Sequence, residues 1–342
     1  MAQHTAKMEM KRMRQNRFLS LWSGVVLLTV LALCVGVALA GDKARHYQVA
    51  VLTPGLAYLP VLEGFQEGLK RLGYVPGENL TVVVEDTHGA VPDLAQRAAR
   101  LVAAKPDVLV TVTTPHTKAV REMTTNVPIV FAWVGDPLRA GLIDSYASSK
   151  NNLTGISVYS GPLSGKRLEI LQEIAPGIKR ILALVATKDS IAESAFQVLI
   201  ETAKKLEIQV LRRDVTTREE IEQVLRETPQ GSADAIYHVP SSLVGAHIEF
   251  LIQKANQEQL PLMVHEDSMV NNGALASYGA DFHLVGVQAA RLVAKLLNGV
   301  HPAEIPIQTP DKLILAVNLT TAKAIGLGIP LSVLERADRL VE

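Results

Sequence analysis

A regular alternation constrains this chain more than any other feature: from His46 onward, short apolar runs alternate with segments whose apolar residues recur at helical spacing. The first such segment places Leu62, Phe65 and Leu69 on one helical face, as expected of a helix packed on a sheet. The apolar runs of this block predict strands at 47–52, 79–86, 107–113 and 128–134. This alternation is typical of parallel sheets with helices on both faces, so the sequence predicts an α/β fold.

A second block of the same kind predicts a second sheet. Its apolar runs indicate strands at 178–186, 207–213, 234–239 and 260–264. Two capping-box patterns, Ser190 with Glu193 and Thr217 with Glu220, predict helix starts inside this block. Because 342 residues are also too many for one typical core, we expect two similar, Rossmann-like lobes.

The C-terminal stretch changes from a strand pattern to a helix pattern around Asp281. A strand-like run at 273–279 precedes a helix at 282–298, which we expect Asp281 to cap and Gly299 to close. A proline-rich segment then leads to a further strand at 312–318. This is too little chain for a third domain. We therefore expect the tail to return and complete both lobes, which would make their connection a hinge.

Residues 1–40 have the pattern of an export signal, with a basic start and an apolar run that ends in a small-x-small site. We expect cleavage after Ala40, and an uncleaved membrane anchor is the alternative because the apolar run is long for a signal. The single cysteine, Cys34, lies in this run, so the mature chain is expected to carry no thiol. Lipid attachment at Cys34 is the alternative, which the bulky Leu33 before it disfavours.

Composition and motifs exclude several classes of function. Lys plus Arg and Asp plus Glu are equal at 34 each, so the net charge gives no indication of a nucleic-acid partner. The sequence contains no nucleophile elbow, no phosphate-binding loop, no zinc-protease motif and no dinucleotide fingerprint after the first strand. Its histidines lack metal-ligand spacing. We predict neither a cofactor nor a metal, and no enzyme activity.

Polar residues gather in the loops that follow the predicted strands, which is where open α/β sheets bind ligands. The run from Thr113 to Thr117 lies at a helix start, where hydroxyls and free backbone N–H groups can hold a carboxylate. Ser241 and Ser242 could do the same from the second lobe. Helix capping is the alternative for each of these residues, and only their convergence favours a ligand site.

The same loops carry acidic and aromatic side chains. A pair among Asp136, Glu266, Asp267 and Asp281 could hold an ammonium group, with Glu266 the strongest candidate. Asp281 has an alternative role as a helix cap. The aromatic residues of these loops could enclose a ligand, although core packing is an equal alternative for the tryptophan. They are Tyr58, Trp133 and Tyr278.

Several stretches together resemble the substrate-binding proteins of ABC transporters in the tryptophan/tyrosine-type family, within the type I periplasmic binding protein fold. They include GFQEGLKRLGYVPGENLTV, VPIVFAWVGDPLRAGLI, GALASYGADFHLVGVQAARLVAKLLNG and LAVNLTTAKAIGLGIPLSVLERAD, and the resemblance spans about residues 46 to 339. It implies two lobes joined by a three-crossover hinge. We place lobe 1 at 46–157 plus 280–311 and lobe 2 at 158–279 plus 312–342.

The resemblance also implies a function: an extracytoplasmic or periplasmic monomer traps a small solute between its lobes and delivers it to a membrane permease driven by an ATPase. The solute would be an amino acid or a similar carboxylate-bearing molecule. The predicted ligand-binding residues are Tyr58, Thr114, His116, Thr117, Asp136, Ser241, Ser242, Glu266 and Asp281.

The sequence leaves three alternative functions. A membrane-anchored extracytoplasmic sensor would need residues 18–40 to be retained. A hydrolase or isomerase could use Asp136 and Glu266 as acid and base, but the sequence pairs no nucleophile with a base. A repressor of the same fold would begin with a helix-turn-helix, in place of an apolar export signal.

Overall fold

The computed structural model describes residues 45–55, 58–88, 93–158 and 161–342, without the side chains of Ser190 and Ser242. The predicted export signal or anchor, its cleavage site and Cys34 lie outside the described residues. Within the described part of the chain, none of the helices combines the length and the apolar character that a membrane span requires.

The first sheet has five strands in the order β2-β1-β3-β4-β5, and all its pairs are parallel. The strands are β1 (Tyr47–Thr53), β2 (Leu80–Asp86), β3 (Val108–Val112), β4 (Ile129–Val134) and β5 (Leu153–Ser157). The helices between them are α2 (Leu59–Arg71), α3 (Leu94–Ala103) and α4 (Thr114–Met123). The predicted alternation of strands and helices is confirmed in this block.

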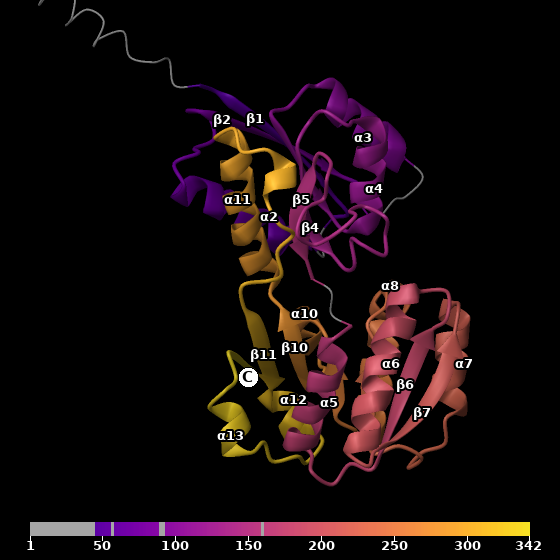
Figure 1. The fold of residues 1–342 in the computed structure, drawn as a ribbon. Helices are drawn as coiled ribbons and strands as arrows, with labels where there is room; N and C mark the ends of the chain where they lie inside the picture. The colour runs from indigo at the N-terminus through magenta and orange to yellow at the C-terminus, as the bar shows by residue number, and fades with distance from the viewer. Residues whose placement is uncertain (1–44, 56–57, 89–92, 159–160) are drawn as a thin grey trace, which may run out of the picture. The chain divides into compact units, whose positions relative to one another are not determined.

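Side-chain alternation along β1 divides the first lobe into two apolar layers. Val49 and Val51 pack with α2 and with α11 (Phe282–Leu297), whereas Ala50 and Leu52 pack with α3 and α4. Figure 1 shows α11, drawn in orange, beside α2, although about two hundred residues separate them in the sequence. Helix α11 therefore completes the hydrophobic core to which β1 and α2 also contribute.

Glycine permits the close approach of α2 and α11. A Cβ atom at Gly286 would lie 2.0 Å from the carbonyl oxygen of Val61, and one at Gly64 would lie 2.0 Å from that of His283. Any larger side chain would force the two helices apart, because backbone atoms cannot move aside as a flexible side chain can.

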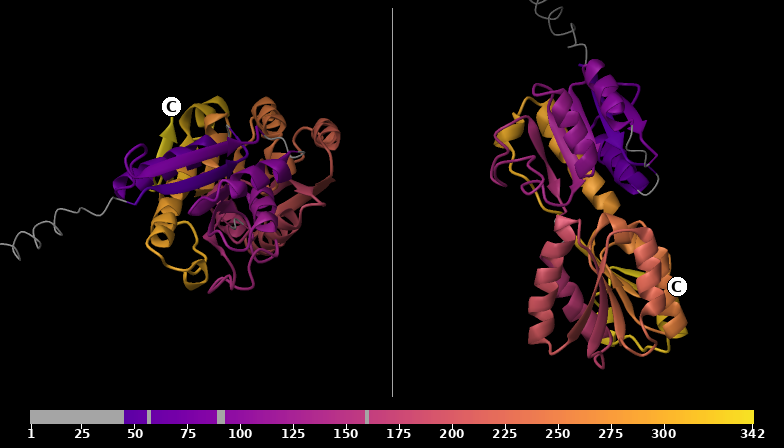
Figure 2. Two further views of the ribbon diagram at one scale, coloured as in Figure 1. Left: turned by 90° about the horizontal axis from the view of Figure 1, so that it is seen from above. Right: turned by 90° about the vertical axis from the view of Figure 1, so that its right-hand side faces the viewer.

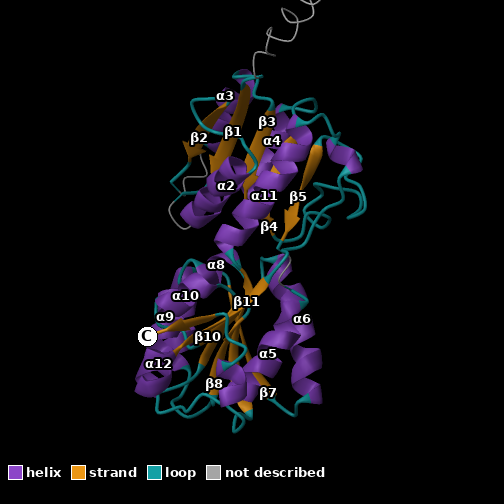
Figure 3. Cartoon of the chain, turned by 90° about the vertical axis from the view of Figure 1, so that its left-hand side faces the viewer, coloured by secondary structure: helices purple, strands orange, loops and turns teal. Residues whose placement is uncertain are grey.

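The second sheet has seven strands in the order β12-β11-β10-β9-β8-β6-β7. They are β6 (Arg180–Ala186), β7 (Gln209–Val215), β8 (Ala235–His238), β9 (Leu262–Val264), β10 (Ala276–Ala280), β11 (Leu313–Asn318) and β12 (Arg339–Val341). Its helices are α5 (Leu163–Ile174), α6 (Ser190–Lys205), α7 (Arg218–Glu227), α8 (Ser242–Gly245), α9 (Ile248–Glu258), α10 (Asp267–Asn271), α12 (Leu319–Ala324) and α13 (Leu331–Leu334). Helices flank these strands on both sides (Figure 3).

One strand pair departs from the predicted parallel arrangement, because β10 and β11 are antiparallel. The chain leaves the second sheet at the end of β10 and returns to it at the start of β11. Both passages therefore use the same end of the sheet, and the two strands must run in opposite directions. The fold class is nevertheless the expected one, α/β with parallel sheets in two lobes.

The chain passes between the two sheets more than once. It does so between β5 and α5, between β10 and α11, and between Gln308, which pairs with Ile156 of the first sheet, and β11. Late residues in orange and yellow accordingly occur in both lobes (Figure 2). We propose that these passages form the hinge, with lobe boundaries at 46–157 plus 280–311 and 158–279 plus 312–342.

Helix caps show which local patterns decided the helix starts. The Asp281 carboxylate accepts from Leu284 N at 2.8 Å, and the Thr217 hydroxyl accepts from Glu220 N at 3.2 Å, so both predicted caps are confirmed. The cap of α6 was predicted one residue too late. It is Asp189, whose carboxylate accepts from Ile191 N at 2.8 Å and adds a favourable negative charge at the positive helix end.

Candidate functional site

His116 is the centre of a buried, neutral hydrogen-bond network at the strand ends of the first lobe. Its side chain is 6% exposed, with Nδ1 2.8 Å from the Thr113 hydroxyl and Nε2 3.1 Å from the Thr87 hydroxyl. Burial lowers the pKa of His116 to about 4, although the Asp86 carboxylate opposes this shift. The imidazole is therefore neutral at physiological pH and joins the loop after β2 to the start of α4.

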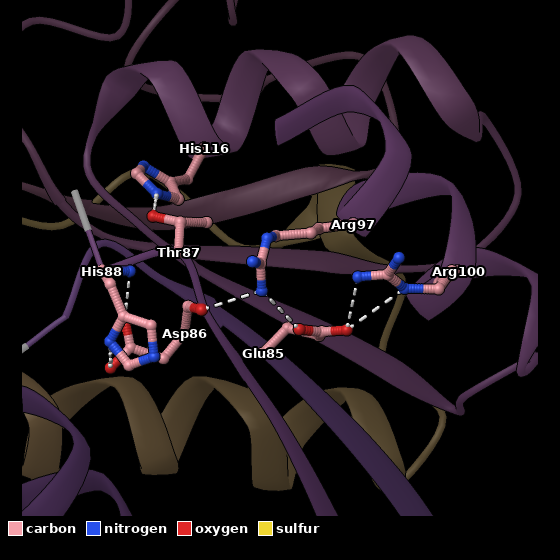
Figure 4. A network of polar contacts seen from close by, with 7 residues as sticks. All are labelled: Glu85, Asp86, Thr87, His88, Arg97, Arg100 and His116. Atoms are coloured by element: carbon pink, nitrogen blue, oxygen red, sulfur yellow. Dashed lines mark hydrogen bonds and ion pairs between the residues drawn. The ribbon is translucent and has the colours of Figure 1, made fainter. Parts of the chain in front are cut away.

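Charged side chains hold the end of β2 against α3 (Figure 4). Glu85 accepts from Arg97 and from Arg100, each at 3.1 Å, and Arg97 also donates to the carbonyl of Asp86 at 3.0 Å. The pair of Arg97 with Glu85 is only partly exposed, so it contributes more to geometry than an isolated surface pair does, whereas Arg100 is 53% exposed. These pairs hold the backbone next to Thr87 in place against α3.

The threonines at the start of α4 are not equivalent. Thr117 is fully buried, where its hydroxyl lies 2.8 Å from the Thr111 hydroxyl and donates to Thr113 O at 2.8 Å. Thr113 has a φ of +73°, an unusual conformation for a residue with a Cβ atom, and its bond to His116 helps to hold it there. Thr114 is half-buried at the first helical position, where backbone N–H groups lack helical partners.

An aromatic cluster lies beside these loops. Phe282, which begins α11, stacks on Trp133 with ring centroids 3.9 Å apart and meets Tyr58 edge-on at 5.3 Å. Trp133 has a φ of +59°, so the end of β4 also carries local backbone strain. Burial, together with the Glu266 carboxylate, raises the pKa of Tyr58, which therefore stays a neutral phenol.

Asp136 closes the turn that follows Trp133 and β4. Its carboxylate accepts from Arg139 N at 3.0 Å and from the Tyr146 hydroxyl at 3.5 Å. The residue is half-buried. A carboxylate has more acceptor positions than these two bonds use, so Asp136 keeps capacity for a donor from a solute.

Ser241 serves as a cap at the strand-end loop of β8. It is 8% exposed, and its hydroxyl oxygen accepts from Val244 N at 3.1 Å, which satisfies the first turn of α8. Accepting this bond uses a lone pair and keeps the O–H group as a donor. The side chain of Ser242, the next predicted contact, lies outside the described side chains.

Glu266 lies next to two histidines whose contact the sequence did not predict. His265 Nε2 is 3.3 Å from Glu266 Oε1, and His265 Nδ1 is 3.2 Å from Nδ1 of His238. The side chains of His265 and Glu266 are 15% and 17% exposed, whereas His238 is fully buried. Burial, then the neighbouring His265 and Arg167, lower the pKa of His238 well below its usual value.

A fully buried arginine completes this region. Arg167, on α5, donates from Nε to the carbonyl oxygen of Tyr278 at 2.6 Å. Burial lowers the pKa of the guanidinium, and Tyr237 and Glu266 oppose that shift. A Cβ atom at Gly279 would lie 2.2 Å from His265 O and 3.6 Å from the guanidinium, so glycine is needed for this approach.

Asp281, the last predicted contact, already serves the junction between the lobes. It is 7% exposed, caps α11, and lies 3.6 Å from the guanidinium of Arg339. Arg339 also pairs with Asp267, whose carboxyl pKa is raised by burial and lowered in part by that arginine. We therefore assign Asp281 a structural role first, and its contact with a ligand stays a prediction.

Sequence reasoning missed Arg167, His238 and Phe282. A signal for Arg167 was present, because it lies at helical spacing with Ser164, Leu168 and Leu171, all fully buried on one face of α5. Metal binding finds no support in the part of the chain that the structure describes, where no cluster of three His, Cys, Asp or Glu side chains could hold an ion.

Two α/β lobes with polar strand-end loops define a two-lobed binding protein of the periplasmic type. The family model described as "ABC transporter substrate binding protein" matches residues 48–341, so the chain belongs to this family, and the predicted resemblance is confirmed.

Individual relatives agree. The chain is 27% identical over 265 residues to the tyrosine-binding protein of Clostridioides difficile, covering 78% of this chain and 76% of that protein. A conserved domain protein from Vibrio cholerae has a TM-score of 0.77 at 31% identity, over 86% of this chain and 100% of that one. An ABC domain from Streptococcus pneumoniae in complex with L-Trp has the same TM-score at 22% identity, which shows a shared fold over 87% and 100% of the two chains.

Proposed function

We propose that this protein is the extracytoplasmic receptor of an ABC importer, and that it binds a small solute, an amino acid, between its two lobes. The observation that carries the proposal is the pair of polar strand-end loops, with His116 between two threonine hydroxyls in lobe 1 and Glu266 beside His265 in lobe 2. A carboxylate in this position can form charge-assisted hydrogen bonds with a solute ammonium group.

The solute carboxylate would be held by neutral donors. Thr114 and the free N–H groups at the start of α4 are the candidates from lobe 1. His116 and Thr117 would support this loop through their hydrogen bonds to Thr113. Ser241 and Ser242 would contribute from lobe 2, and Asp136 and Asp281 would complete the polar rim. Helix N-termini favour anions because their N–H groups and dipole both carry partial positive charge.

We further propose that the solute is an aromatic amino acid. The Clostridioides relative is named a tyrosine-binding protein, and the Streptococcus structure contains L-Trp. In this chain, the cluster of Tyr58, Trp133 and Phe282 places aromatic rings next to the proposed polar groups. Such rings favour an aromatic solute through stacked and edge-on contacts.

Transport would follow from closure of the lobes about the passages described above. A solute that binds better to the closed form shifts the protein toward that form, and water exclusion then strengthens the charged contacts. The closed, monomeric protein would deliver its solute to a membrane permease driven by an ATPase. The alternative of an anchored sensor depends on residues 18–40, outside the described residues, and sequencing the N-terminus of the exported protein distinguishes the two.

Thermal unfolding of residues 41–342 against a panel of amino acids, small carboxylates, sugars and nucleosides tests this function. Ligand at about 100 times its dissociation constant should stabilise the protein by about 2.7 kcal/mol. We expect a selective rise in Tm with L-tyrosine or L-tryptophan, and a smaller one with des-amino analogues. A rise with sugars or nucleosides alone would contradict the proposed solute class.

A further inference from the structure

The C-terminal segment of the chain holds α10, the short helix that directly follows Glu266. Helix α10 packs beside β10 and β11 (Figure 1). At the end of this helix, Asn318 Nδ2 donates to the carbonyl oxygen of Val270 at 2.9 Å. The Thr321 hydroxyl donates to the carbonyl oxygen of Gly273 at 3.1 Å. Residues of β11 and α12 therefore fix the end of α10 through two hydrogen bonds.

The start of α10 is held by one arginine of the same segment. Arg339, in β12, donates to the carboxylate of Asp267, the first residue of α10. Its guanidinium also lies 3.6 Å from the carboxylate of Asp281, which follows β10 directly. Both carboxylates are largely buried. Arg339 therefore joins the start of α10 to the point at which the chain leaves the second sheet.

Acidic side chains crowd the start of α10. Burial raises the pKa of the Asp267 carboxyl, and Arg339 opposes that shift. Asp281 and Glu266 raise the same pKa further, because like charges that lie close together repel one another. Loss of the guanidinium would leave this repulsion uncompensated at Asp267. The start of α10 would then be free to move, and Glu266 is its immediate neighbour in the chain.

We propose that Arg339 is a positioning residue that fixes the start of α10 and thereby holds Glu266 in place for the ammonium group of a solute. It does so by joining Asp267 to Asp281. This inference rests on the proposed function. Because Arg339 acts through the position of one carboxylate, its removal should weaken the binding of a solute that carries an amine and have little effect on a solute without one.

Calorimetric titration of L-tryptophan into the unaltered protein and into Arg339→Met at neutral pH tests this inference. We expect about tenfold weaker binding to the variant, as when a charge-assisted hydrogen bond is lost. Indole-3-propionate, which lacks the amine, should bind both proteins equally. Arg339→Lys keeps the charge but not the planar fork, so it should restore part of the affinity. Equal or tighter binding of L-tryptophan to Arg339→Met would overturn the inference.

A double-mutant cycle with Glu266→Gln shows whether Arg339 acts through Glu266. Once the carboxylate is absent, its position no longer matters to the ammonium group. Arg339→Met should therefore weaken L-tryptophan binding by less than about twofold in the Glu266→Gln background. An equal loss in both backgrounds would mean that Arg339 affects binding by another route, and the inference would be wrong.

The matched control is Arg336→Met, which removes an arginine from the same C-terminal segment. In the described part of the chain, the Arg336 guanidinium contacts Glu173 on α5 and the carbonyl oxygen of Ser332. The side chains of this ion pair are 48% and 41% exposed. Affinity for L-tryptophan should stay within about twofold of the unaltered protein, since exposed pairs contribute little. A loss as large as that in Arg339→Met would show a general effect of the segment and contradict the inference.

Amide hydrogen exchange in the ligand-free protein separates this inference from the proposed function. The Met269 N–H group donates to the carbonyl oxygen of Glu266 at 3.3 Å, so its exchange reports on the start of α10. It should exchange faster in Arg339→Met than in the unaltered protein, because local opening becomes easier. Unchanged exchange would overturn the inference even if amino acids bind. Failure of every amino acid to bind the unaltered protein would instead overturn the proposed function, and the inference with it.

Discussion

The loops after β2 and β3 in the first lobe and those after β8 and β9 in the second differ in how their polar side chains are satisfied. In the first, neutral His116 joins two threonine hydroxyls. In the second, Glu266 and Arg167 are both largely removed from solvent and interact electrostatically, and Glu266 also contacts His265. The first arrangement offers neutral donors to a carboxylate, whereas the second keeps opposite charges out of water.

The largest effect should follow from breaking the charged arrangement of lobe 2. Arg167→Met removes the buried cation. The Tyr278 carbonyl then loses its hydrogen-bond donor, and Glu266 loses a nearby positive charge. We expect a loss of about 3–5 kcal/mol in the free energy of unfolding, as for other buried pairs that lose one partner. Urea unfolding measures it. Arg218→Ala, in an exposed pair with Glu222, should cost less than about 1 kcal/mol, and an equal loss in both variants would contradict the comparison.

The neutral network of lobe 1 should make the free energy of unfolding depend on pH, with an effect smaller than that of Arg167→Met. The folded protein holds the pKa of His116 at about 4, below the value of about 6.5 for an unperturbed imidazole. Because the unfolded chain binds this proton first, the contribution of His116 is complete above about pH 6.5 and is lost as the pH falls through about 4, by up to about 3 kcal/mol.

Urea unfolding of His116→Gln as a function of pH tests this assignment. The variant should lose the part of the acid destabilisation that comes from this residue. His88→Gln is the control, because that side chain is 77% exposed and its ion pair in the described part of the chain is with the partly exposed carboxylate of Asp86. Identical pH profiles for His116→Gln and the unaltered protein would show that His116 is not held neutral by burial.

The smallest effects should separate support from contact within α4. Thr117→Val removes a buried hydroxyl that bonds to Thr111 and to Thr113 O, and should lower the free energy of unfolding by about 1 kcal/mol. Thr114→Val should leave stability nearly unchanged and weaken L-tryptophan binding by about threefold to tenfold. Denaturation and calorimetry on both variants check this pattern. A loss of binding in Thr117→Val and a loss of stability in Thr114→Val would show that Thr117 contacts the ligand and Thr114 supports the helix.

The fold was predictable because its elements are defined by short-range periodicity. Apolar runs gave the strands, and Asp281 and Thr217 gave two helix starts, since a cap depends on residues within one turn. The start of α6 was misplaced because Asp189 and Ser190 are both good caps and the sequence does not choose between them. The antiparallel pair was missed because it depends on where the chain re-enters the sheet.

The site was only partly predictable because its contacts are long-range. Glu266 and Tyr58 were found as polar residues at strand ends, a property visible along the chain. The bond from Arg167 to the Tyr278 carbonyl spans 111 residues, and the contact between His238 and His265 depends on the pairing of β8 with β9. Strand order, which single-sequence periodicity does not give, decides both.

The central claim is tested most directly by calorimetric titration of L-tryptophan and L-tyrosine into the unaltered protein and into Glu266→Gln at neutral pH. The account predicts saturable binding of at least one of them to the unaltered protein. It predicts about tenfold to a hundredfold weaker binding to the variant, because the ammonium loses its charged acceptor. Equal affinity in the two proteins, or no binding of either amino acid to the unaltered protein, would contradict it.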